Sequence, residues 1–182
     1  LCRNRAELVA AARSDLPEWA LAVAIPARGV IGVRLSGIAP FGSDLHSTIV
    51  HEMAHLALGR SEAAAGAPLP IWFHEGVAEW TSRSYHPGST IDLSLEAAMS
   101  QLIPLEKLED SFPEGRDRAA LAYVQARAFV DFVVERGGRR SIADILDAFE
   151  RGQDFDTAFE AATGWSRPDA EAVATSPCGC QM

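Results

Sequence analysis

The stretch S-T-I-V-H-E-M-A-H-L-A-L-G, residues 47–59, decides the fold around which the rest of the chain is arranged. Ser43 or Asp44 suits a helix N-cap and Gly59 suits a helix end, so the sequence predicts a helix that runs to about Leu58. Apolar side chains surround its two histidines, which predicts that this helix is largely buried. Residues four positions apart lie on one helix face, so His51 and His55 can both reach a single ion.

The histidine pair has the spacing of a zinc site. Two imidazoles placed in this way can both bind zinc at about 2.0–2.1 Å. Glu52 cannot be a third ligand in that geometry, but it can contact a water molecule held by the metal. Two histidines and a glutamate in a buried helix are costly unless they are paired or bound to a metal. The alternative is a helical interaction module without metal, in which the HExxH pattern arises by chance.

A second predicted helix, Trp72–Arg83, offers the remaining groups of such a site. Glu75 follows His55 at a distance that allows a connection and an antiparallel return. Glu75 and Glu79 are again four positions apart, so both carboxylates share a face. One of them can bind the metal, while the other can accept the N–H of a ligating imidazole. Gly76 has no side chain, which lets this helix approach another one closely.

Composition limits the remaining possibilities. The chain has 182 residues, of which 48% are hydrophobic and 23% charged, which predicts one packed domain over residues 1–182. The formal net charge is −9 and Lys107 is the only lysine, so no basic nucleic-acid surface is expected. No apolar run approaches the roughly 18 residues of a membrane-spanning helix.

The rest of the chain predicts an α+β fold with strands early and helices late. Trp19–Ile25 and Val30–Leu35 are short apolar runs separated by Ala27-Arg28-Gly29, which favours a β-hairpin. A helix is expected before them, over Asn4–Ser14. Further helices are predicted over residues 95–101, 117–136, 141–150, 154–163 and 166–174.

H-E-M-A-H followed by P-I-W-F-H-E-G-V-A-E-W resembles the gluzincin metallopeptidases, the thermolysin-like clan, and most closely their small bacterial peptidase-MA-like domains. The stretch from Tyr123 to Gly138 is also similar to that family. The resemblance covers about residues 19–165 and is most specific at 51–55 and 70–80. It implies a zincin-like fold with a short N-terminal β-sheet, an active-site helix and a mainly helical C-terminal half. The matching residues of the second motif are Pro70, Trp72, Glu75, Gly76, Ala78, Glu79 and Trp80.

The resemblance also implies roles for individual residues. Glu75 would be the third zinc ligand beside His51 and His55, and Glu79 would support His51. A downstream tyrosine, here Tyr123, would donate a hydrogen bond to the oxyanion, although a packing role in an amphipathic helix is the alternative.

The three other histidines have less specific expectations. His74 departs from the family pattern, where a small polar residue is more usual. It is expected to line the cleft or pack against a neighbour, but it is also an alternative ligand in place of Glu75. His46 and His86 are expected in loops or at the surface, with His86 as an alternative oxyanion donor.

These residues predict a zinc-dependent peptidase with Zn²⁺ as cofactor and a peptide or protein as substrate. Glu52 would act as the general base for a metal-activated water. The alternative is a zinc-binding, catalytically weak domain that recognises peptides or cell-wall material. Val30–Leu35 is either a sheet edge that receives an extended peptide or an ordinary buried strand.

The chain ends carry the three cysteines and the indications of location. One prediction pairs Cys2 with Cys178 or Cys180 and ties the termini together, and the alternative is that all three are free thiols or linked to missing segments. The chain begins at Leu1 rather than Met, which suggests a processed fragment without its signal peptide. The family resemblance implies an extracytoplasmic or secreted bacterial protein, and a cytoplasmic location stays open.

Overall fold

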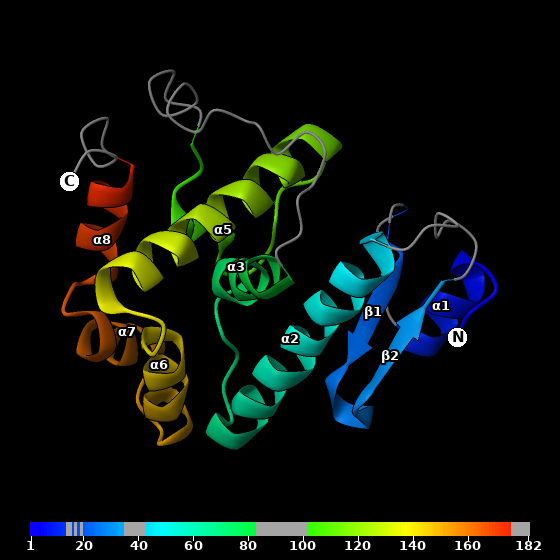
Figure 1. The fold of residues 1–182 in the computed structure, drawn as a ribbon, viewed down its shortest axis with the longest axis horizontal. Coiled ribbons are helices and arrows are strands. Elements are labelled where there is room, and N and C mark those ends of the chain that lie inside the picture. The colour runs from blue at the N-terminus through cyan, green and yellow to red at the C-terminus, as the bar shows by residue number, and fades with distance from the viewer. Residues whose placement is uncertain (14–15, 17, 19, 35–42, 83–101, 176–182) are drawn as a thin grey trace. The chain divides into compact units, whose positions relative to one another are not determined.

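The computed structural model describes the chain except for residues 14–15, 17, 19, 35–42, 83–101 and 176–182. In the described part, helices predominate and the strands form one two-stranded antiparallel sheet (Figure 1), which confirms the α+β class. The chain divides into two compact units, Leu1–Arg60 with Ala78–Ser84, and Ser61–Val77 with Tyr85–Met182. The prediction of a single domain over residues 1–182 stays a prediction.

The first unit contains the predicted hairpin. Helix α1 (Arg5–Ala12) precedes strand β1 (Ala22–Ile25), the 3₁₀ turn η1 (Pro26–Arg28) and strand β2 (Val30–Val33). Ala22 lies opposite Val33 and Ile25 lies opposite Val30, so the strands pair antiparallel as predicted. Leu8 is fully buried, and its Cδ1 lies 3.0 Å from where a side chain at Gly32 would begin, so α1 packs closely on β2.

Cys2 is buried beside this hairpin. Its N–H donates to the carbonyl of Val33 at 2.7 Å, and Cys2 forms a parallel bridge with Arg34. Cys178 and Cys180 lie outside the described residues, so the expected link between the chain ends stays a prediction.

Helix α2 (Ser43–Ala65) is longer than predicted, and the expectation that Gly59 ends it is wrong. Gly59 is buried inside the helix, and a glycine there costs only about 1 kcal/mol relative to alanine. The added turns are stabilised by Ser61, whose hydroxyl donates to Glu150 at 2.5 Å. The helix ends instead at Gly66, which has a φ of 70° and donates its N–H to the carbonyl of Glu62.

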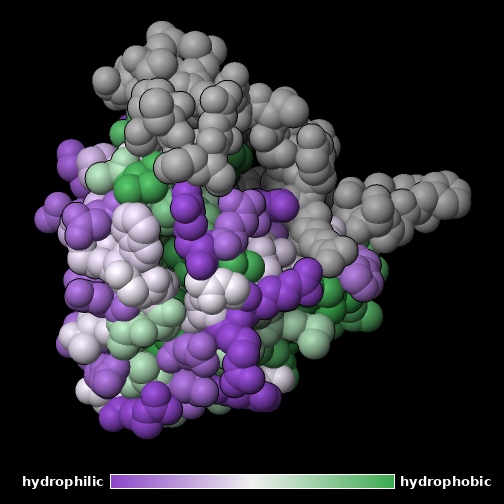
Figure 2. Space-filling model, turned by 60° about the vertical axis from the view of Figure 1, so that its left-hand side comes forward, coloured by the Kyte–Doolittle hydropathy of each residue, from purple (hydrophilic) through white to green (hydrophobic). Residues whose placement is uncertain are grey.

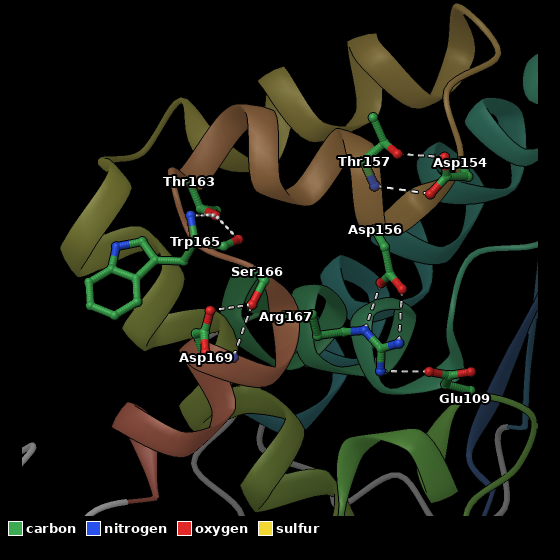
Figure 3. Close-up of polar contacts among 9 residues, drawn as sticks. All are labelled: Glu109, Asp154, Asp156, Thr157, Thr163, Trp165, Ser166, Arg167 and Asp169. Atoms are coloured by element: carbon green, nitrogen blue, oxygen red, sulfur yellow. Dashed lines mark hydrogen bonds and ion pairs between the residues drawn. The ribbon is translucent and has the colours of Figure 1, made fainter.

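A short connection, Gly66–Pro70, leads to helix α3 (Ile71–Ser82). The elements that follow are η2 (Leu105–Leu108), α5 (Arg116–Gly137), α6 (Ser141–Glu150), α7 (Phe155–Thr163) and α8 (Arg167–Ala174). Asp154 and Ser166 cap the N-termini of α7 and α8 by accepting backbone N–H groups (Figure 3). These helices confirm the predicted ones, while the helix predicted over 95–101 lies outside the described residues.

The core of the second unit fixes α3 in place. Trp72 is fully buried, and its ring lies edge-on to Phe129, Phe155 and Phe159 at centroid distances of 5.2, 5.7 and 6.5 Å. Edge-on aromatic pairs of this kind add about 0.5–1.5 kcal/mol each beyond the burial of their surface. One turn after Trp72, Gly76 lies so close to α5 that a Cβ there would be 2.6 Å from the carbonyl oxygen of Ala126. The expected close helix approach at Gly76 is therefore confirmed.

The surface is rich in hydrophilic side chains, which cover much of the face in Figure 2 with apolar areas between them. The large hydrophobic side chains that are exposed in the described part are those of Leu1, Val30 and Met53. None of the helices described combines the length and apolar character that a bilayer crossing requires.

Candidate metal centre

His51 and His55 meet on one face of α2. Their Nε2 atoms are 3.0 Å apart, and their ring planes are inclined by 76°. Both side chains are half-buried. This convergence follows from their spacing, because side chains four positions apart stand one above the other on a helix. The two ring nitrogens thus point at one small region of space.

Glu75 of α3 completes a set of three ligand atoms. One atom each from His51, His55 and Glu75 can be chosen so that all lie within 4.8 Å of one another. In tetrahedral zinc with bonds of about 2.1 Å, neighbouring ligand atoms are about 3.4 Å apart. The histidine pair is near that spacing, and rotation of the flexible glutamate side chain can close the remaining distance. The donor set therefore fits a divalent metal ion such as zinc.

Glu79 lies behind His51. Its Oε1 is 3.2 Å from His51 Nδ1, and the glutamate is buried. When a carboxylate accepts the Nδ1–H of an imidazole, the ring is held with Nε2 free to bind a metal. Glu79 follows Glu75 by one turn of α3, so a single helix carries one candidate ligand and the support of another. The geometry matches the role that the family resemblance implies for Glu79.

Glu52 is buried with 8% of its surface exposed, and it is the neighbour of His51 in α2. Burial keeps its carboxylate away from bulk water, which suits an acid–base group that acts inside a site. Its assignment as general base stays a prediction.

His74 points elsewhere. Its Nε2 is 3.6 Å from Oε2 of Glu62, whose other carboxylate oxygen accepts the N–H of Leu69 at 2.9 Å. In the described part of the chain, the group of potential metal ligands contains Glu75 and not His74. The sequence analysis missed the contribution of Glu62 because it ended this helix at about Leu58, before Glu62.

The remaining candidates are Tyr123, His46, His86 and the strand expected to receive a peptide. Tyr123 of α5 is half-buried, and its ring lies edge-on to Phe112 at 4.9 Å. His46 is exposed on α2, in agreement with a surface position. His86 lies outside the described residues. Strand β2 pairs with β1 along its length, and its use as a peptide-binding edge stays a prediction.

Comparison with known proteins identifies the class to which this fold and cluster belong. The sequence profile of the peptidase MA superfamily matches residues 6–173, so the chain belongs to that superfamily. It is 22% identical over 121 residues to the uncharacterized protein YhcO of Bacillus subtilis (strain 168), an alignment that covers 63% of this chain. The chain spans about a third of that relative, since the match covers 35% of its length. No solved structure gives a significant match.

Proposed function

We propose that this protein is a zinc-dependent peptidase in which His51, His55 and Glu75 hold the ion. The observation that carries the proposal is the convergence of these three donors from α2 and α3. Two histidines and one glutamate are a ligand set of catalytic zinc, which keeps a fourth position for water or substrate. Membership of the peptidase MA superfamily supports a peptide or protein as the substrate.

When bound, zinc polarises a water molecule and lowers its pKa towards 7. The carboxylate of Glu52 takes the proton of the attacking water and then delivers it to the nitrogen of the leaving amine. Glu79 holds the proton of His51 at Nδ1 and so fixes the orientation of that ring. The hydroxyl of Tyr123 donates to the carbonyl oxygen of the scissile bond as negative charge develops there.

A zinc-binding domain that recognises peptides or cell-wall material without cleaving them is the alternative. Glu52 favours the enzyme, because a zinc site that only binds or stabilises needs no general base. An extracytoplasmic bacterial setting is part of the proposal, and it rests on the family resemblance alone.

Glu52→Gln separates the enzyme from the binding domain. Zinc content by elemental analysis should stay near that of the wild type, while chelator-sensitive cleavage of an unfolded protein should fall by about 10²–10⁴-fold. Glu135→Gln, which changes an exposed glutamate of α5, is the matched control and should leave both unchanged. Undiminished cleavage by Glu52→Gln would remove Glu52 as the base, and absence of cleavage by the wild type across a peptide panel would favour the alternative.

The ligand assignment has its own test. Glu75→Ala should lower zinc occupancy, since two histidines alone make an incomplete site. Unchanged occupancy would redirect the assignment to His74, the alternative third ligand on the same helix.

A further inference from the structure

Arg167 lies at the centre of a polar cluster at the start of α8 (Figure 3). Its Nε and Nη2 donate to the two carboxylate oxygens of Asp156 at 2.7 and 3.1 Å, and its Nη1 is 2.6 Å from Oε1 of Glu109. The arginine side chain is only 15% exposed. Hydrogen bonds to Asp156, and the charge of Glu109, raise the pKa of Arg167. One guanidinium therefore joins α8, the first turn of α7 and the residue that follows η2.

Glu109 has a second contact, made by its backbone. Its carbonyl oxygen accepts the N–H of Ile71 at 2.8 Å. Ile71 is the first residue of α3, and the first N–H groups of a helix have no partner inside the helix. Glu109 thus fixes the entry of α3 with its backbone, while its own side chain is held by Arg167.

Glu75 stands one turn beyond Ile71 in the same helix. A helix moves as a stiff rod over one turn, so a change at its entry displaces Glu75 as well. Zinc–ligand distances vary by only about 0.2 Å in a good site. We propose that the ion pair between Arg167 and Glu109 positions Glu75 for metal binding. This inference rests on the proposed function, in which Glu75 is a zinc ligand.

The other polar contacts of this cluster have local roles. Asp154 and Ser166 each bond to a residue three positions later and cap their own helices (Figure 3). Asp156 links α7 to α8, whereas Glu109 carries the contact to α3. The two carboxylates on Arg167 therefore provide a matched comparison, because each can be removed while the other still pairs with the arginine.

The test compares Glu109→Ala with Asp156→Ala in the full chain. Zinc affinity is measured by chelator competition, and the ligand geometry by the visible absorption of the cobalt(II)-substituted protein. We expect Glu109→Ala to weaken zinc binding by about three- to tenfold and to change the cobalt spectrum. Asp156→Ala should stay within about twofold of the wild type, with an unchanged spectrum, because the contact between Glu109 and α3 remains.

Loss of stability alone is separated from loss of positioning by two further measurements. The zinc-induced rise in the unfolding temperature, taken for each variant relative to its metal-free form, reports affinity and should be smaller for Glu109→Ala. If Glu109→Ala does not fold, the milder variants Glu109→Gln and Asp156→Asn are compared instead. Glu109→Gln should then weaken zinc binding more than Asp156→Asn does. Glu109→Gln keeps an oxygen acceptor for Arg167, so it should bind zinc more tightly than Glu109→Ala.

Equal affinities and identical cobalt spectra for the two variants of either pair would overturn the positioning role and leave the proposed function intact. Failure of the wild-type protein to bind zinc would instead overturn the proposed function.

Discussion

Replacing Gly76 with alanine tests how α3 is held against α5. A Cβ at this position would lie 2.6 Å from the carbonyl oxygen of Ala126 and 2.8 Å from Cγ2 of Val130. The valine methyl can move, but the carbonyl belongs to the backbone of α5. Since ordinary contact begins at 3.4 Å, the two helices must separate locally by about 0.8 Å.

The energetic effect on folding is small because two terms oppose each other. Overpacking of this kind costs about 1–3 kcal/mol. Alanine is favoured over glycine inside a helix by about 1 kcal/mol. The free energy of unfolding should therefore fall by about 0–2 kcal/mol, and Gly76→Ala should remain folded.

The effect on the candidate metal centre should be larger. Glu75 precedes Gly76, and a shift of about 0.8 Å is about four times the tolerance of zinc–ligand distances. Zinc affinity by chelator competition should fall by about tenfold or more. The kcat/KM for a cleaved peptide at saturating zinc should fall by about 10–100-fold, because misplacement by about 1 Å costs up to that much.

Gly32→Ala is the control. Its new Cβ would lie 3.0 Å from Cδ1 of Leu8 and at ordinary contact distance from Val23, and Gly32 lies in β2 rather than in a ligand-bearing helix. It should leave zinc affinity unchanged. If Gly76→Ala bound zinc as tightly as the wild type, the close helix contact would have no part in placing Glu75.

Three further predictions concern the support of His51, the core and pH. Glu79→Gln removes the negative charge beside His51 Nδ1 and should weaken zinc binding by about 10–100-fold in a chelator competition. Trp72 buries an indole N–H that has no hydrogen-bond partner among the described residues. In urea unfolding, Trp72→Ala should lower the free energy of unfolding by about 3–5 kcal/mol, and Trp72→Phe should lower it by less. Hydrogen bonds from Thr157 lower the pKa of Asp154, so the native state is stabilised at neutral pH and loses this contribution as the pH falls through that lowered pKa. Asp154→Ala should therefore lower the urea midpoint at pH 7, and its difference from the wild type should close in acid; a difference that stays constant with pH would contradict the capping role.

The candidate site could be predicted largely from local patterns. The i, i+4 pairs His51 with His55 and Glu75 with Glu79 place side chains on shared helix faces, and the structure brings the three proposed ligands together. The roles of these residues remain predictions. The hairpin and the late helices were predictable for the same reason, since turns, caps and periodic apolar positions are local signals.

Features that depend on tertiary contacts could not be predicted in this way. Gly59 resembles a helix end when read locally, but contacts such as that of Ser61 with Glu150 carry α2 to Ala65. The bond from Ile71 to Glu109 joins segments distant in sequence. No periodicity encodes such a pairing, because it exists only once the helices have packed.

The brevity of the Gly66–Pro70 connection has a consequence for biosynthesis. The proposed ligands His51, His55 and Glu75 lie close together in the sequence, so the ribosome synthesises them within one short stretch of chain. Closing a short loop costs little entropy, so under the proposed function few residues need to be ordered to bring these ligands to one ion. The aromatic residues of α5 and α7 that surround Trp72 are synthesised later. Under the proposed function, the complete ligand set is therefore synthesised before the aromatic core that holds Trp72.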